Sequence, residues 1–285
     1  FEKNKGRWST GHAKRVKQSL VVDVFPTIGL IPIDTIQAKD CLLVIRKIEG
    51  RGALDVAGRA KQRMSSIFRY AIYTGYTEKN PADALADVIQ SRKVTHQAAL
   101  PSNQLPAFLN AVNTSDHITG LTRQALRLIV LTFVRPGELR AAMWSEIDFE
   151  KQEWRIPAER MKMNEEHVVP LSRQSIEVLK KTYEISGSYE YVFPGHHNFK
   201  RPMSENTLTF AIRKRLNFDA TAHGFRTVAS TILNETGFRP DVIERQLAHG
   251  ERNKVRAAYN QAQYLEDRTD MMQWWADYLD TQLEG

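Results

Sequence analysis

Between residues 146 and 171 the sequence reads Ile147-Asp148-Phe149, then Glu153-Trp154-Arg155-Ile156, and then His167-Val168-Val169-Pro170-Leu171, with polar residues between these short segments. Segments of this length that contain aromatic and β-branched residues and are bounded by polar turns are typical of β-strands. We therefore predict one hairpin preceded by a leading strand. Because the rest of the chain has helical periodicity, the predicted fold class is mainly α with a small antiparallel β-sheet (α+β).

Helical patterns cover most of the remaining sequence. In the first third of the chain they predict helices over 10–25, 35–48 and 54–74. After residue 100 they predict helices over 102–113, 118–133, 172–186, 204–216, 223–235, 240–248, 252–260 and 264–281. The last of these helices carries one broad apolar flank made of Met271, Met272, Trp274, Trp275, Tyr278 and Leu279.

Local signals predict the ends and faces of the first three helices. Pro26 should stop the first helix, because proline has no backbone N–H. Asp34-Thr35 should cap the start of the second helix. The predicted buried face of the third helix comprises Val56, Met64, Ile67, Phe68 and Ile72. Its predicted opposite face comprises Arg59, Lys61, Arg63 and Arg69.

Positive charge is concentrated in the first third of the chain. The net charge is +7, and residues 1–93 contain 17 Lys and Arg against 9 Asp and Glu, whereas residues 94–285 contain 23 against 24. This asymmetry favours a polyanionic partner, most often nucleic acid, although a well-solvated basic surface is an alternative. We predict a basic helical domain at 1–92, a polar linker at 93–99, and a second domain at 100–285.

Composition excludes several classes of protein. Cys41 is the single cysteine, which excludes internal disulfides and cysteine-rich metal sites and makes a reducing, cytoplasmic setting the default. The sequence contains no run of about 18 apolar residues, the length that a membrane-spanning helix needs. The first residues, from Phe1 onward, have neither a starting Met nor the apolar stretch of a signal peptide, so we expect the true N-terminus to lie upstream.

Four segments carry side chains that could act on a phosphate. In Arg135-Pro136-Gly137-Glu138, a carboxylate could hold the guanidinium rigid. Arg160-Met161-Lys162-Met163 lies at the tip of the predicted hairpin. His223-Gly224-Phe225-Arg226 places an imidazole and a guanidinium on one face at the start of a helix. Leu247-Ala248-His249 is followed ten residues later by Tyr259. Each segment alone also fits an ordinary role, such as a surface ion pair, a solvated turn lysine, a helix cap or a packed tyrosine.

Taken together, the order Arg, Lys, His-x-x-Arg, His, Tyr resembles the catalytic signature of tyrosine recombinases of the phage integrase family, including the integrases of lambdoid and satellite phages. The spacings are also similar, with 23 residues from Arg226 to His249 and 10 from there to Tyr259. The resemblance covers essentially the whole chain. It implies a two-domain fold, in which a SAM-like helical core-binding domain precedes a catalytic domain.

The resemblance implies cleavage of DNA by a tyrosine without a metal ion or other cofactor. The implied catalytic set comprises the nucleophile Tyr259, its base His223, the phosphate clamps Arg135 and Arg226, the transition-state contact His249 and the proton donor Lys162. Glu138 would orient Arg135 or the lysine loop. The sequence agrees, since it has neither an Asp/Glu cluster typical of a metal cage nor a Gly-rich phosphate loop.

The implied partner is double-stranded DNA at attachment sites, with DNA-bending accessory proteins and an excision factor, in the bacterial cytoplasm at the nucleoid. The implied activity is the integration or excision of a mobile element such as a prophage or genomic island, by chains that are monomeric in solution and tetrameric on DNA. A further N-terminal domain that binds arm sites, usual in such integrases, is not among these residues. The candidate DNA contacts in the first domain are Lys14, Arg15, Lys17, Arg59 and Arg63.

Two questions stay open at this level. The 264–281 helix could pack on its own domain, or it could dock on a neighbouring subunit as the resemblance implies, in which case deleting 264–285 should impair recombination more than binding. The chain could also be a type IB topoisomerase-like enzyme that relaxes DNA, or a regulator of the same fold that binds DNA without cutting it. The compact basic domain and the long C-terminal helix favour recombination, and the complete residue set argues against the regulator.

Overall fold

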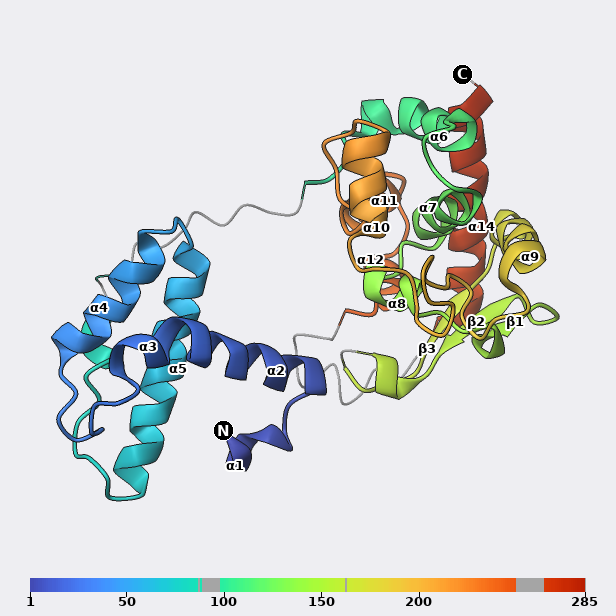
Figure 1. Cartoon of the computed structure of the whole chain (residues 1–285). Helices are drawn as coiled ribbons and strands as arrows, with labels where there is room; N and C mark the ends of the chain where they lie inside the picture. The colour runs from blue at the N-terminus through green and yellow to red at the C-terminus, as the bar shows by residue number, and fades with distance from the viewer. Residues whose placement is uncertain (87, 89–97, 162, 250–263, 285) are drawn as a thin grey trace. The chain divides into compact units, whose positions relative to one another are not determined.

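The computed structural model describes residues 1–86, 88, 98–161, 163–249 and 264–284. The chain divides into two compact units, Phe1–Thr95 and His96–Gly285 (Figure 1). Within the described ranges, no helix combines the length and the apolar content that a membrane span requires.

All regular secondary structure in the described residues of the first unit is helical. Its elements are α1 (Glu2–Lys5), α2 (Thr10–Ser19), a π-helical turn (Leu20–Val24), α3 (Phe25–Ile28), α4 (Ala38–Glu49), α5 (Leu54–Tyr73) and a 3-10 turn (Asp83–Leu85). Helices α4 and α5 pack against each other, and their facing side chains form the core. Val44 and Ile45 of α4 and Met64 and Phe68 of α5 are all buried there.

The first helix does not stop at Pro26. Residues Leu20–Val24 form a π-helical turn, in which the N–H of Phe25 donates to the carbonyl of Leu20. The backbone then continues as α3, with Pro26 in the first turn. A proline is tolerated there because the first N–H groups of a helix have no intrahelical acceptor. The predicted stop was therefore wrong.

Helix α4 starts at Ala38, three residues later than predicted. Thr35 lies in a turn, where its backbone N–H and its hydroxyl donate to the carbonyl of Pro32 at 3.0 and 2.8 Å. Gln37 caps the helix instead, and its N–H donates to the carboxylate of Asp40 at 2.9 Å. This bond between Gln37 and Asp40 replaces the cap that was expected from Asp34-Thr35.

The buried face of α5 differs in part from the predicted one. Met64 and Phe68 are buried and Val56 is half-buried, as predicted, but Ile67 and Ile72 are 37% and 36% exposed. The buried stripe continues instead through Ala57, Ala60 and Ala71. Small residues on this stripe allow the close approach of α4, which leaves the larger isoleucines on the rim.

The second unit combines helices with a three-stranded antiparallel sheet in the order β1-β2-β3. Its helices are α6 (Leu105–Thr114), α7 (Gly120–Thr132), α8 (Pro136–Arg140), α9 (Arg173–Ser186), α10 (Thr207–Phe210), α11 (Gly224–Glu235), α12 (Pro240–Gln246) and α14 (Leu265–Glu284), with 3-10 turns at Ser102–Gln104, Trp144–Glu146 and Ala158–Arg160 and a π-helical turn at Ala211–Arg215. The strands are β1 (Ile147–Asp148), β2 (Glu153–Ile156) and β3 (His167–Pro170).

The sheet follows the predicted pattern. Trp154 of β2 pairs with Ile147 of β1 and with Val169 of β3, while Ile156 pairs with His167. Trp154 and Ile156 are buried, whereas Arg155 between them is exposed, as the alternation of side chains along a strand requires. The predicted hairpin with a leading strand, and the mainly helical α+β class, are confirmed.

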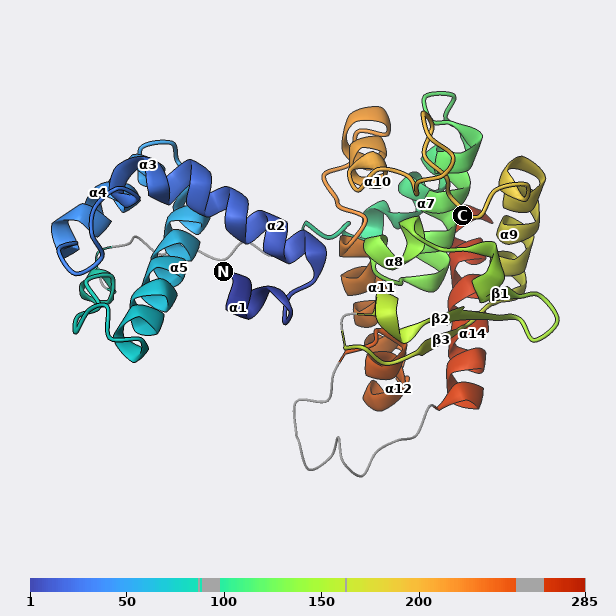
Figure 2. The same ribbon diagram turned by 60° about the horizontal axis from the view of Figure 1, so that its bottom comes forward.

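Helices α7 and α14 lie side by side in the second unit, as both views show (Figures 1 and 2). Helix α14 also contacts α6, α9, α12 and β3. Met271, Met272 and Trp275 are fully buried, and the indole N–H of Trp275 donates to the carbonyl of Val130 at 2.9 Å. Packing of the C-terminal helix on its own domain is therefore observed, whereas its docking on a neighbouring subunit stays a prediction. Deletion of α14 would open the core.

Candidate active site

Arg135 stands at the sharp turn between α7 and α8. Helix α7 ends where Phe133 adopts a left-handed conformation with φ of 39°, and Arg135 is the cap that precedes Pro136. The carboxylate of Glu138 accepts the backbone N–H of Arg135 at 2.9 Å and its Nη1 at 2.7 Å. Because Glu138 is buried, one carboxylate holds both the backbone and the guanidinium of Arg135 in place.

Arg226 lies in the first turn of α11 and is buried. Its Nη1 donates to the carbonyl of Phe133 at 2.9 Å, and its Nη2 donates to the carbonyl of Leu247 at 2.6 Å. Burial, and then the charge of Arg135, lower the pKa of Arg226 to about 10, so it stays protonated at neutral pH. The turn is tight: a Cβ at Gly224 would lie 2.4 Å from the carbonyl oxygen of Ala98, so only glycine fits.

Helix α12 ends in a Schellman motif. Ala248 adopts φ of 48°, its N–H donates to the carbonyl of Arg245 at 3.0 Å, and the N–H of His249 donates to the carbonyl of Glu244 at 3.1 Å. In this motif the chain reverses at once, and the next carbonyls point away from the helix without intrahelical partners. Those carbonyls belong to Gln246, Leu247 and Ala248.

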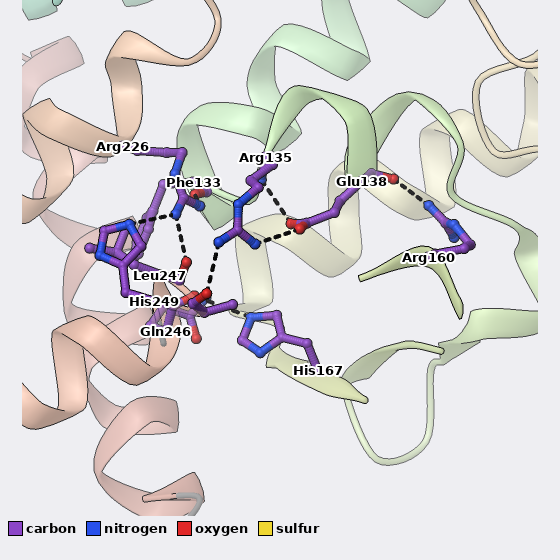
Figure 3. A network of polar contacts seen from close by, with 10 residues as sticks. Phe133, Arg135, Glu138, Arg160, His167, Arg226, Gln246, Leu247 and His249 are labelled. Atoms are coloured by element: carbon purple, nitrogen blue, oxygen red, sulfur yellow. Dashed lines mark hydrogen bonds and ion pairs between the residues drawn. The ribbon is translucent and has the colours of Figure 1, made fainter. Parts of the chain in front are cut away.

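These three consecutive carbonyls accept hydrogen bonds from three different elements (Figure 3). The carbonyl of Gln246 accepts Nε2 of His167 from β3 at 3.2 Å, and that of Ala248 accepts Nη2 of Arg135 at 2.7 Å. The carbonyl of Leu247, between them, accepts Arg226. The C-terminal end of a helix carries partial negative charge, which favours two guanidiniums there. The end of α12 therefore holds the guanidiniums of both arginines in their orientation.

His249 completes this group. Its Nδ1 lies 2.8 Å from a carboxylate oxygen of Glu244, and its Nε2 lies 3.2 Å from Nη2 of Arg226. A carboxylate accepts and a guanidinium donates, so in the neutral ring the proton resides on Nδ1. Glu244 therefore orients the imidazole and leaves its Nε2 beside the guanidinium of Arg226.

His223 stands at the start of α11 among the same charges. Partial burial, then the charges of Arg226 and Arg135, and then His249 lower its pKa, while the carboxylate of Glu138 opposes this effect. The neutral imidazole is therefore favoured at neutral pH. The structure thus brings together all four catalytic candidates that lie in its described residues, and it places Glu138 beside them.

Two members of the predicted set, Lys162 and Tyr259, lie outside the described residues. Near Lys162, the described Arg160 forms an ion pair with Glu146 and donates from Nη2 to the carbonyl of Glu138 at 2.6 Å. The 3-10 turn that precedes Lys162 is therefore tied to α8, the helix that Arg135 caps (Figure 3).

Sequence reasoning missed the residues that hold this arrangement together. They are Arg160, His167, Gln246 and Arg268. Arg268 follows Glu266-Asp267 and has the local signature of a solvated charged turn, although it is fully buried. His167 is marked by its place in a predicted strand, where a buried polar residue needs a partner.

The candidate DNA contacts of the first unit differ in exposure. Lys14, Arg15 and Lys17 on α2 and Arg59 on α5 are exposed. Arg63 is half-buried and donates to the hydroxyl of Ser19, which ties α5 to the end of α2. Among the described residues, no three His, Cys, Asp or Glu side chains gather as a metal site would require.

Comparison with known proteins identifies the family. Residues 98–266 match the model of the phage integrase family, and residues 1–88 match that of the phage integrase central domain. The chain belongs to the phage integrase family. Its matched ranges include the four catalytic candidates described above as well as Lys162 and Tyr259.

Several integrases are similar to the chain over nearly its whole length. It is 44% identical to the integrase of Enterobacteria phage P4, over 96% of the chain and 66% of that protein. It is 40% identical to the prophage integrase IntS of Escherichia coli (strain K12), over 100% of the chain and 74% of that protein. The chain therefore spans about two thirds to three quarters of the length of these relatives.

Solved structures of integrases share the fold. A lambda integrase(75–356) dimer bound to a COC′ core site matches with a TM-score of 0.68 and 19% identity, covering 86% of this chain and 89% of that chain. The Tn1549 transposon integrase (residues 82–397) in complex with circular intermediate DNA matches with a TM-score of 0.67 and 16% identity, covering 95% and 96%.

Proposed function

We propose that the chain is the DNA-binding and catalytic part of a site-specific recombinase, an integrase that cuts and rejoins DNA strands through a 3′-phosphotyrosyl intermediate. The reaction would integrate or excise a mobile element such as a prophage. One observation carries the proposal: in a member of the phage integrase family, Arg135, Arg226 and His249 converge on one helix end with His223 beside them.

The two guanidiniums fit the charge that develops during phosphoryl transfer. Each is fixed by backbone carbonyls before any substrate arrives, so little reorganisation is needed in the transition state. A guanidinium has five N–H groups, and the bonds described for Arg135 and Arg226 leave some of them to reach nonbridging phosphate oxygens. Glu138 would act through Arg135 by holding its guanidinium in place.

Tyr259 is the proposed nucleophile. A free tyrosine has a pKa near 10, so only roughly a thousandth is ionised at neutral pH, and a base must take its proton. His223 suits this role because its neighbours favour the neutral ring. The phenol oxygen bonds to phosphorus, its proton passes to His223, and the bond from phosphorus to the 5′-oxygen breaks.

The leaving 5′-oxygen takes a proton from Lys162, which yields a 5′-hydroxyl and a 3′-phosphotyrosyl bond. A 5′-hydroxyl from a partner strand then attacks this bond and releases the tyrosine, so the second step reverses the first with a different strand. His249 would help to hold the transition state by keeping the guanidinium of Arg226 in place through its Nε2. Each charge is met by a side chain of the chain itself, so the proposed chemistry uses neither a metal ion nor a nucleotide.

DNA is the proposed substrate of both units. The exposed Lys14, Arg15, Lys17 and Arg59 of the first unit suit phosphates, and for each phosphate neutralised log K should fall by roughly 0.9 per log unit of salt. The chain shares its fold with the subunits of a lambda integrase tetramer bound to a Holliday junction, which supports a tetramer on DNA. A monomer in solution is part of the same proposal. DNA-bending proteins and an excision factor belong to the same proposal.

The test is a covalent-trapping experiment on a nicked candidate attachment site. The wild-type chain should form a protein–DNA adduct that maps to Tyr259, and Tyr259→Phe should bind the site without forming the adduct. Tyr264→Phe, a matched tyrosine change close by, should keep it. Adducts that persist in Tyr259→Phe would refute the assignment. Relaxation of supercoils without strand exchange would identify a topoisomerase, and wild-type binding without adducts would identify a regulator.

A further inference from the structure

Arg268, in the first turn of α14, is a completely buried arginine. Its Nε and Nη2 donate to Oε1 of Gln246 at 3.0 and 2.7 Å, and Nη2 also donates to the carbonyl of Val168. One side chain therefore joins α14 to the last residue of α12 and to β3. Burial, with a contribution from Arg245, lowers its pKa to about 9, so it remains charged at neutral pH.

Gln246 connects this arginine to the active site. The side-chain amide of Gln246 donates to the carbonyl of Thr132 at 3.4 Å, and its own carbonyl accepts His167. The next two carbonyls along the chain, those of Leu247 and Ala248, hold the two active-site arginines. Because the three residues are consecutive, a displacement of Gln246 is transmitted directly to both of these acceptors.

We infer that Arg268 is a positioning residue for strand cleavage: by holding Gln246, it fixes the carbonyls that aim Arg135 and Arg226. The inference rests on the proposed function. A buried charge is unfavourable unless its donors are satisfied, and an apolar side chain could fill the same space without that penalty. What an apolar side chain cannot do is bind Gln246 and Val168 at once, which the planar fork of arginine does.

Three variants separate positioning from folding. Arg268→Met removes the fork and leaves Oε1 of Gln246 without these two donors in the core. Arg268→Met/Gln246→Leu replaces both groups by apolar side chains of similar size, which keeps the core filled if the single variant is unstable. Arg268→Lys keeps the charge without the fork. The control is Arg173→Ala, which removes an exposed ion pair of 3.1 Å between α9 and Asp277 of α14 and does not touch α12.

Three properties are measured for each variant. Hydrogen exchange followed by mass spectrometry on the peptide 240–249 reports whether the end of α12 loosens. Binding to the attachment site reports the integrity of the DNA-binding surface. Cleavage is measured on the nicked phosphodiester and on the same DNA with a methylphosphonate at the scissile position, which lacks one charged oxygen and so depends less on the guanidiniums.

Arg268→Met and the double variant should both show faster hydrogen exchange in peptide 240–249 and bind DNA as the wild type does. Both should cleave the phosphodiester roughly 10- to 100-fold more slowly. Cleavage of the methylphosphonate should fall by a smaller factor. Arg268→Lys should retain part of the activity, and Arg173→Ala all of it. A general loss of structure would instead slow both substrates equally.

The inference is overturned if the double variant cleaves the phosphodiester at the wild-type rate, if it slows both substrates equally, or if exchange in 240–249 is unchanged. Failure of the proposed function shows elsewhere, since the wild-type chain itself would then form no adduct. Hydrogen exchange does not depend on activity, and it would still decide whether Arg268 holds the end of α12.

Discussion

His167 should make the second unit sensitive to mild acid. This histidine is buried in β3, where its Nε2 donates to the carbonyl of Gln246. Burial, then the charges of Arg268 and Arg245, lower its pKa from the usual 6.5 to about 3. The folded chain therefore keeps the ring neutral in a pH range where the unfolded chain protonates it.

The sign and size of the effect follow from this difference. Between pH 6.5 and about 3 the unfolded chain binds one more proton than the folded chain at this site, so stability falls as the pH falls through that window. From about pH 7.5 to about pH 5, linkage gives a loss of about 2 kcal/mol of unfolding free energy. This figure barely changes for any folded-state pKa below about 4.

The assay is denaturant unfolding followed by tryptophan fluorescence at several pH values. Four tryptophans, Trp144, Trp154, Trp274 and Trp275, belong to the second unit, and Trp8 belongs to the first. In a Trp8→Phe background the signal therefore reports only the unit that contains His167. His167→Gln keeps an N–H donor for the carbonyl of Gln246 but cannot titrate, so its loss of stability on acidification should be smaller by about 2 kcal/mol.

The control is His117→Gln, the same change at an exposed histidine, which should leave the pH dependence of stability as it is in the wild type. Equal losses of stability in the wild type and in His167→Gln between neutral and mildly acid pH would refute the reasoning. Such a result would mean that the ring takes up its proton in the folded unit, and that its bond to the end of α12 does not keep it neutral.

Three further predictions concern the core and the proposed base. Trp275→Ala should lower the unfolding free energy by about 3–5 kcal/mol, because it leaves a cavity in the core and removes the donor to the carbonyl of Val130. Trp274→Ala, at a half-buried neighbour, should lower it less, and denaturant unfolding measures both. The cleavage rate of the nicked substrate should fall only below pH 6.5, since partial burial and the neighbouring charges lower the pKa of His223. Glu138→Gln should move this acidic fall in rate to still lower pH, because the carboxylate of Glu138 raises that pKa. A shift of the fall to higher pH in the pH–rate profile of Glu138→Gln would contradict the proposal. Deletion of residues 265–284 should leave the second unit without fixed tertiary structure by near-UV circular dichroism, because α14 supplies part of its core. A truncated unit that stays folded and is defective only in strand exchange would instead favour a role of this helix in subunit docking.

Much of the fold could be predicted because its signals are local. The alternation around Trp154 and Ile156 is a property of a strand, and the apolar flank of α14 is a property of a helix. The ends of elements were less predictable, since Pro26 and Asp34-Thr35 are compatible with more than one local solution. Whether a π-helical turn or another cap is used depends on neighbouring residues that compete for the same donors.

The order and spacing of the catalytic candidates were recognisable from the sequence, since residue types at fixed separations are a linear pattern. Their contacts were predictable only where they are local, as between Arg135 and Glu138, three residues apart. Helix α5 shows that periodicity alone does not predict which apolar side chains are buried. Ile67 and Ile72 are apolar enough for a core, but alanines occupy the buried stripe of α5.

By itself, then, the sequence determined the helices, the small sheet and the identity of the residues that could act on a phosphate. Only the tertiary structure decided how they are aimed. Arg135 is held by a carbonyl 113 residues away and Arg226 by one 93 residues away. Every residue has a backbone carbonyl, so no side chain marks those at the end of α12 as acceptors. What singles them out is a left-handed turn at Ala248, together with a buried arginine on the last helix.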